Sequence, residues 1–171
     1  ELVSVFDKDL ENLENKLNQC TSFDELLDSG VDGVFISTYV DAAADYVLRA
    51  LKKGKHVFCE KPPSLSKEEL LEIKEFQSSS NLILKYGFNH RFHYSVIEAK
   101  KLIEEGTMGK LLWMRGVYGK AGSLDFKEKW RNYRKYAGGG ILMDQGIHML
   151  DLFRFFSGEE FICKASYLDT I

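Results

Sequence analysis

The feature that most constrains the fold is a regular alternation of short apolar runs with helical patterns over residues 1–88. The runs are rich in β-branched and aromatic residues and are bounded by turn or capping residues, which is typical of buried strands. The predicted strands are Leu2–Phe6, Val31–Thr38, His56–Glu60 and Leu82–Phe88. Short apolar strands separated by helices predict an α/β fold with a parallel sheet covered by helices on both faces.

The helical patterns between these strands carry capping signals. Ser22 with Glu25, and Ser66 with Glu69, have the spacing of a capping box, and Gly54 is suited to end a helix. The predicted helices are Leu10–Gln19, a short helix from Ser22 to Gly30, Asp41–Lys55 and Lys67–Gln77.

The pattern changes near Asn89–Phe92, where we expect a domain boundary. Helices are predicted beyond it over Tyr94–Gly106 and Ile141–Phe156. Lys110–Gly119 shows the partial alternation of a strand with one wet face, and Glu160–Thr170 is a second strand-like run. The second part of the chain is therefore expected to have α+β architecture.

The composition of the chain limits the classes of partner that it is expected to bind. The 171 residues are 44% hydrophobic with a formal net charge of -3 and no basic block, so neither nucleic acid nor an anionic membrane is an expected partner. Cys20, Cys59 and Cys163 lack the spacing of a metal site, and reduced thiols in the cytoplasm are expected.

Glu60-Lys61-Pro62 directly follows a predicted parallel strand. Ligands of open α/β sheets bind outside the carboxyl ends of the strands, and the proline restricts the backbone that aims Lys61. Lys61 could orient a substrate hydroxyl or carbonyl there. A solvated lysine before a helix-starting proline explains the local pattern equally well.

Asp144 and His148 lie four residues apart in a predicted helix, directly after Gly138–Gly140. Histidine is the side chain best suited to exchange a proton near neutral pH, and a carboxylate one turn away could orient it. A helix pair of minor structural value is the alternative, and zinc is a poorer one because two ligands do not make a site.

Other candidates are less specific. Asp7 ends the first predicted strand, where a dinucleotide-binding fold places a ribose-binding acid, although a turn or capping aspartate is the more frequent case. GFNHRF (residues 87–92) and WRNYRK (130–135) offer arginines and aromatic rings that suit a polyhydroxylated or acidic substrate, or that serve only packing. His56 and His93 are expected to be structural.

The sequence resembles the glucose–fructose oxidoreductase/inositol dehydrogenase (Gfo/Idh/MocA) family over essentially the whole chain. The resemblance rests on VDGVFIST (31–38), ALKKGKHVFCEKPPSLSKEELLEI (50–73), GFNHRF (87–92) and AGGGILMDQGIHMLDLFRFFSGE (137–159). It implies a partial NAD(P)-binding Rossmann domain at residues 1–90. It also implies a partial α+β substrate and oligomerisation domain at 91–171 with an open antiparallel sheet, and a homo-oligomer.

The resemblance also implies roles for individual residues. Lys61 corresponds to the family's EKP lysine near the nicotinamide and substrate, and Asp144 and His148 to its active-site pair, with His148 as the general acid/base. The implied cofactor contacts are Asp7, Ser37, Thr38, Glu60 and Lys61. The implied substrate contacts are Arg91, Trp130, Arg131, Asp144 and His148, and no metal ligand is expected.

Three features depart from the family pattern. The chain has no G-x-G-x-x-G motif, Tyr39 follows Thr38 where the family commonly has Pro or Asn, and Ala43 stands where a histidine is common. Family members are longer and carry more strands in the second sheet. The sequence is therefore expected to be a fragment, or the ordered part of a longer protein.

The expected function is hydride transfer between NAD or NADP and a hydroxyl or keto carbon of a sugar, nucleotide sugar or polyol. Asp7 slightly favours NAD because a 2′-phosphate would meet a carboxylate, while Lys8 leaves NADP open. A non-catalytic binding or assembly module, or an inactive fragment, is the alternative. A hydrolase-type activity in which NAD is regenerated within one turnover is a third possibility.

Overall fold

The computed structural model describes residues 1–9, 18–119 and 130–167, which form two compact units. Unit 1 comprises Glu1–Gly87 and Leu124–Asp144, as far as these are described, and unit 2 comprises the described parts of Phe88–Ser123 and Gln145–Ile171. The division after Gly87 lies close to the expected boundary at residue 90. Trp130–Asp144, which we expected in the second domain, group with unit 1.

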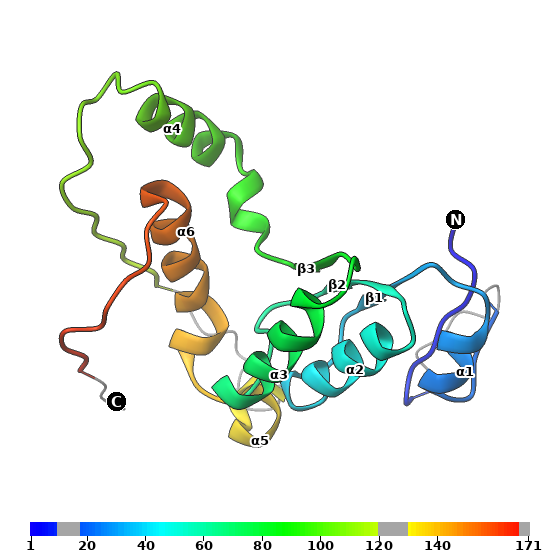
Figure 1. The fold of residues 1–171 in the computed structure, drawn as a ribbon. Coiled ribbons are helices and arrows are strands. Elements are labelled where there is room, and N and C mark those ends of the chain that lie inside the picture. Colours follow the sequence, from blue (N-terminus) through cyan, green and yellow to red (C-terminus); the bar gives the residue numbers. More distant parts are fainter. Residues whose placement is uncertain (10–17, 120–129, 168–171) are drawn as a thin grey trace. The chain divides into compact units, whose positions relative to one another are not determined.

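Unit 1 contains a parallel sheet of three strands in the order β1-β2-β3 (Figure 1). The strands are β1 Gly33–Ile36, β2 His56–Cys59 and β3 Leu84–Tyr86. Helix α2 (Val40–Lys52) connects β1 to β2, and α3 (Lys67–Ser78) connects β2 to β3. The α/β fold with a parallel sheet is thus confirmed, since helical crossovers are what parallel neighbours require.

The predicted caps are present. The Ser22 hydroxyl accepts a hydrogen bond from the Glu25 backbone N–H at the start of α1 (Phe23–Asp28), and Ser66 and Glu69 form a reciprocal capping box on α3. Helix α2 is followed by Gly54 at φ +75°, which a residue with a Cβ adopts only at a cost.

The first predicted strand, Leu2–Phe6, is wrong as a full strand. Val5 alone makes a parallel bridge with Gln19, donating to the Asn18 carbonyl and accepting from the Cys20 N–H. A strand needs several consecutive paired residues, and a single bridged residue does not supply them. The helix predicted over Leu10–Gln19 lies largely outside the described residues.

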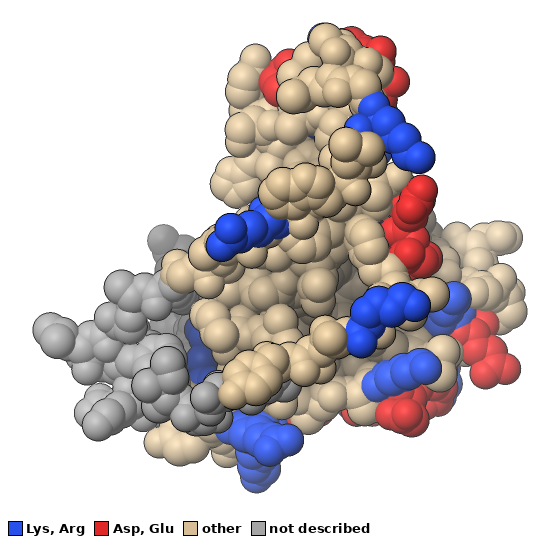
Figure 2. Space-filling view, turned by 90° about the vertical axis from the view of Figure 1, so that its left-hand side faces the viewer, with Lys and Arg blue, Asp and Glu red and all other residues tan. Residues whose placement is uncertain are grey.

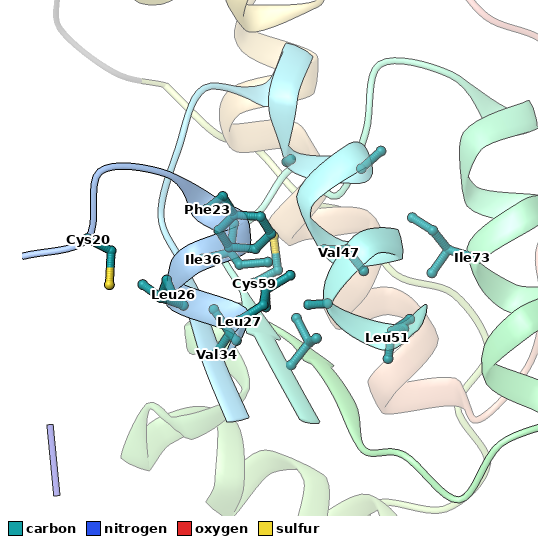
Figure 3. Close-up of a cluster of buried hydrophobic side chains, with 14 residues drawn as sticks. Cys20, Phe23, Leu26, Leu27, Val34, Ile36, Val47, Leu51, Cys59 and Ile73 are labelled. Carbon is teal, nitrogen blue, oxygen red and sulfur yellow. The ribbon is translucent and has the colours of Figure 1, made fainter. Parts of the chain in front are cut away.

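The core of unit 1 lies on one face of the sheet (Figure 3). Helix α2 buries residues spaced by three and four, which place one face on the strands. The labelled side chains of the cluster come from α1, β1, α2, β2 and α3, with Cys20 beside them: Phe23, Leu26, Leu27, Val34, Ile36, Val47, Leu51, Cys59 and Ile73.

The opposite face of the sheet departs from the expectation that helices cover both sides. Phe35 and Phe58, which are register partners on β1 and β2, stack there with ring centroids 4.9 Å apart. Their exposed fractions are 66% and 38%. Within the described residues the two rings cover each other in part and stay exposed to solvent to these extents.

Unit 2 is helical. It contains a 3-10 turn at Asn89–Phe92 and helices α4 (Tyr94–Glu104) and α6 (Ile147–Ser157). A π-helical turn, Leu142–Gly146, precedes α6, so the helix predicted over Ile141–Phe156 forms with an irregular start. A 3-10 turn at Trp130–Asn132 and helix α5 (Arg134–Ala137) belong to unit 1.

The two strands predicted in the second part are wrong for the residues that the structure describes. Neither Lys110–Gly119 nor the described part of Glu160–Thr170 has strand structure. A strand exists only when a neighbouring strand takes up its backbone hydrogen bonds, and no described strand pairs with either segment. Gly116 lies instead against the side chains of Met149 and Phe153 on α6, where an added Cβ would collide with the terminal methyl group of Met149.

No helix among the described residues is long and apolar enough to cross a membrane. On the face drawn in Figure 2, Lys and Arg side chains and Asp and Glu side chains are scattered among uncharged residues.

The three cysteines differ in reactivity. Burial raises the pKa of the Cys59 thiol to about 12, and Cys20 is also buried, whereas Cys163 is exposed. Because the thiolate is the reactive form, iodoacetamide at pH 8 should modify Cys163 alone in the folded protein and all three thiols after denaturation. Peptide mass spectrometry checks this, with Cys163→Ser as the unreactive control. Rapid native labelling of Cys59 would contradict the described core.

Candidate active site

Four of the predicted cofactor residues lie at one edge of the sheet. Ser37 and Thr38 directly follow β1, and Glu60 and Lys61 directly follow β2. The two strands end in register at Ile36 and Cys59, and the Glu60 N–H donates to the Ile36 carbonyl at 2.9 Å. Their side chains therefore start from neighbouring carboxyl ends, the edge at which open α/β sheets bind ligands.

The carboxylate of Glu60 lies against Gly87, just beyond β3. A Cβ on Gly87 would come within 2.8 Å of Glu60 Oε2, and the Gly87 N–H donates to the Cys59 carbonyl at 2.8 Å. Glu60 Oε2 also accepts from the Lys61 N–H at 3.3 Å. A larger residue at position 87 would therefore displace the Glu60 carboxylate from its present position.

Lys61 and Asp144 form the central contact of this edge. Lys61 Nζ donates to Asp144 Oδ1 at 3.1 Å and also to the Asp144 backbone carbonyl. The side chains are only 14% and 23% exposed, so the pair is less screened than a surface ion pair. Arg131 Nε lies 3.7 Å from the same Asp144 oxygen. The Lys61–Pro62 peptide bond is cis.

The glycine run before Asp144 allows the backbone to approach the side chain of Leu65 closely. Gly138 has φ +73°, and a Cβ there would lie 2.5 Å from Leu65 Cδ2. The backbone of the run thus approaches the segment that follows Lys61. This contact explains why Asp144, far along the chain, can reach the lysine.

An aromatic cluster lies next to Arg131. Tyr39 contacts Trp130 and Tyr136, with ring centroids 5.0 and 5.3 Å apart, and the Arg131 guanidinium lies 4.3 Å from the centre of the Trp130 ring. Tyr39 is 46% exposed. We had noted Tyr39 only as a departure from the family pattern, and its contact with Trp130 makes it a candidate site residue.

His148 belongs to unit 2 and lies in the first turn of α6. It is 4% exposed. The His90 ring stacks on it with centroids 3.9 Å apart and an interplanar angle of 15°, and Phe88 contacts it edge-on at 6.1 Å. The imidazole of His148, the candidate general acid/base, is thus packed against the rings of His90 and Phe88.

Arg91 forms hydrogen bonds with a residue of the same helix, α6. Its Nε donates to Asp151 Oδ2 at 2.7 Å, and a second nitrogen donates to Oδ1, while Phe155 lies 5.2 Å from the guanidinium. The hydrogen bonds from Arg91 to Asp151 raise the pKa of the guanidinium. Asp151 is only 6% exposed, so Arg91 compensates a buried charge, and its predicted role in substrate binding stays a prediction.

Asp7 makes a local turn, in which its Oδ1 accepts a hydrogen bond from the Asp9 N–H at 2.9 Å. Its predicted contact with ribose stays a prediction. No group of three His, Cys, Asp or Glu residues in the described part of the chain is arranged to hold a metal ion.

The Arg91–Asp151 pair should matter for stability. Arg91→Met leaves the buried Asp151 carboxylate without its hydrogen-bond donors and should cost about 1–3 kcal/mol of the free energy of unfolding. Arg154→Met is the matched control, because the ion pair of Arg154 with Glu160 is exposed and should contribute under about 1 kcal/mol. Urea unfolding of both variants measures the difference, and equal losses would contradict the assignment.

The first half of the chain, residues 1–88, matches the model of the oxidoreductase family with an NAD-binding Rossmann fold. Residues 96–166 match the C-terminal domain model of the GFO/IDH/MocA proteins. The two matches cover nearly all of the chain in the order that the family has.

The relatives of this chain include dehydrogenases named for levoglucosan and for inositols. The chain is 34% identical to levoglucosan dehydrogenase of Pseudarthrobacter phenanthrenivorans over 77% of its length, and 32% identical to scyllo-inositol 2-dehydrogenase (NAD(+)) of Bacillus subtilis over 81%. These matches cover 34% and 39% of the relatives. The chain therefore spans well under half of their length.

Solved structures of dehydrogenases are also similar to this chain. Myo-inositol 2-dehydrogenase from Lactobacillus plantarum matches 92% of this chain and 49% of its own with a TM-score of 0.80 and 31% identity. Levoglucosan dehydrogenase in complex with NADH and levoglucosan matches 83% of this chain and 39% of its own with a TM-score of 0.71 and 29% identity. Together with the family models, these likenesses show that the chain belongs to the Gfo/Idh/MocA family of NAD-binding oxidoreductases.

Proposed function

We propose that the protein carrying this chain is an NAD(P)-dependent oxidoreductase that acts on a hydroxyl or keto carbon of a sugar, nucleotide sugar or polyol. The observation that carries the proposal is the shielded Lys61–Asp144 pair at the carboxyl edge of parallel strands. An ammonium fixed in this way offers an aimed hydrogen-bond donor where family members bind the nicotinamide and substrate. The relatives named above act on cyclic polyhydroxylated compounds, which supports the substrate class.

The residues at the sheet edge fit the cofactor. Ser37 and Thr38 offer hydroxyl groups, and Glu60 and Lys61 offer a carboxylate and an ammonium, which suit ribose hydroxyls and the carboxamide of a nicotinamide. Asp7 is the candidate for the adenosine ribose, which favours NAD slightly over NADP. When bound, the nicotinamide supplies or accepts the hydride.

Side chains of the protein bind the reacting oxygen of the substrate and transfer its proton. Lys61 donates a hydrogen bond to the reacting oxygen and stabilises negative charge that develops on it. Asp144 holds the lysine through its carboxylate and its backbone carbonyl. His148 takes the proton of the hydroxyl during oxidation and returns it during reduction.

Substrate binding is assigned to the aromatic and cationic groups around Asp144. Trp130, stacked by Arg131 and packed on Tyr39, presents a ring suited to the apolar C–H face of a sugar. Arg131 offers donors to hydroxyl or acidic groups. Arg91, which belongs to unit 2, remains a candidate, with one edge of its guanidinium used by Asp151.

We further propose the domain assignment of residues 1–90 to cofactor binding and 91–171 to substrate binding and assembly. Exposed apolar residues of unit 2, such as Leu112, Trp113 and Ile162, support a homo-oligomer. The free cysteines among the described residues are consistent with the cytoplasm.

The first test is a titration with NADH and NADPH that follows quenching of Trp113 and Trp130. Saturable binding is expected, with NADH at least as tight as NADPH. Lys61→Met should weaken NADH binding roughly tenfold, because one charge-assisted hydrogen bond is lost. Lys74→Met, an exposed lysine of α3, should leave it unchanged. If this chain folds but binds neither nucleotide, it is an inactive fragment, and the same result with the full-length protein would contradict the proposed function.

His148 is tested by turnover in the full-length protein. His148→Ala should lower kcat by about 10²–10⁴-fold, since general acid/base catalysis contributes that much. His93→Ala, at an exposed histidine, is the control and should retain wild-type turnover. Steady-state oxidation of myo-inositol and levoglucosan with NAD provides the measurement. An unchanged kcat in His148→Ala would remove His148 from the mechanism.

A further inference from the structure

Three of the four histidines of the chain gather in unit 2. His90 stacks on His148, His93 contacts His90 edge-on with centroids 5.3 Å apart, and Tyr118 lies parallel to His90 at 6.1 Å. The rings of His148 and Tyr118 are thus both near-parallel to the ring of His90, and the closer of the two contacts is the one with His148. The proposed mechanism uses only His148 of these.

The backbone turn that carries His90 is fixed to the helix that carries His148. His90 lies in the 3-10 turn Asn89–Phe92, which contacts α6. The next residue, Arg91, makes two hydrogen bonds to the buried Asp151 of α6. Asp151 lies about one turn after His148, so this double contact holds the neighbouring His90 ring beside it.

A face-to-face stack restricts an imidazole in a specific way. The ring can slide in its plane, but it cannot rotate out of that plane without losing contact with its neighbour. Phe88, which contacts His148 at an interplanar angle of 88°, limits movement from a second direction. Together with the direction of the Cβ–Cγ bond on α6, the plane of the ring restricts Nδ1 and Nε2 to two orientations related by a ring flip, and proton transfer depends on the direction of these nitrogens.

We propose that His90 is a positioning residue for His148: its ring stack fixes the plane of the His148 imidazole and hence the direction of the two ring nitrogens. This inference rests on the proposed role of His148 in proton transfer. It assigns to His90 no contact with substrate or cofactor. The positioning role requires a flat ring at position 90.

The test compares two uncharged replacements of similar bulk. His90→Phe keeps a flat ring and His90→Leu does not, while His93→Phe changes the exposed neighbour. The first measurement is the NMR signal of His148 Hε1, which the ring current of a stacked neighbour shifts upfield. We expect the upfield shift in the wild type, in His90→Phe and in His93→Phe, and its loss in His90→Leu.

The second measurement is steady-state kinetics of the full-length protein. His90→Leu should lower kcat by roughly 10–100-fold with little change in KM, because a misdirected base slows the reaction without weakening binding. His90→Phe should restore most of kcat. A role in folding alone would not separate the two variants in this way, and unchanged amide signals of α4 and α6 verify that unit 2 stays folded.

The outcomes separate this inference from the proposed function. An unshifted His148 Hε1 in the wild type, or a kcat of His90→Leu equal to the wild type, would overturn the positioning role. If His148→Ala retains full turnover, the proposed function of His148 fails even when the NMR signal shows the stack. Equal loss of kcat in His90→Phe and His90→Leu would also overturn the requirement for a ring.

Discussion

The parallel pairing of β1 with β2 is the constraint on which the proposed site depends. Val34, Ile36, Val57 and Cys59 point to one face and are buried there, so a slip of one residue between β1 and β2 would move the two buried side chains of one strand to the other face. The same register makes both strands end at one edge, where Thr38 and Lys61 begin their loops. Burial of four apolar side chains thus determines where the polar residues of the edge start.

The Lys61–Asp144 contact fixes the direction of the lysine side chain, which the sheet alone does not fix. A lysine side chain has four rotatable bonds, and in solvent it would sample many directions at little cost. Here two acceptors from one residue, the carboxylate and the carbonyl of Asp144, hold the ammonium. The glycine run that contacts Leu65 brings Asp144 there, so a loop distant in sequence completes the edge that the strands begin.

Much of unit 1 could be predicted from the sequence because its signals are local. A capping box such as Ser66 with Glu69 lies within one turn, and the apolar run before Glu60 ends where β2 ends. The contact of Tyr39 with Trp130 and the stack of His90 on His148 join residues far apart in the chain, and no spacing rule indicates them. The predicted strand at Lys110–Gly119 failed for a related reason: alternation describes a residue pattern, but a strand also needs a partner.

Each unit holds its own candidate catalytic groups. Lys61 is held by Asp144, and both belong to unit 1; His148 is held by His90 and Phe88, and all three belong to unit 2. Neither arrangement requires a bound ligand. Preorganised groups of this kind need not be ordered during the reaction, which is how fixed donors and bases lower a barrier. The direction of the lysine and the plane of the imidazole are thus properties of the separate folded units.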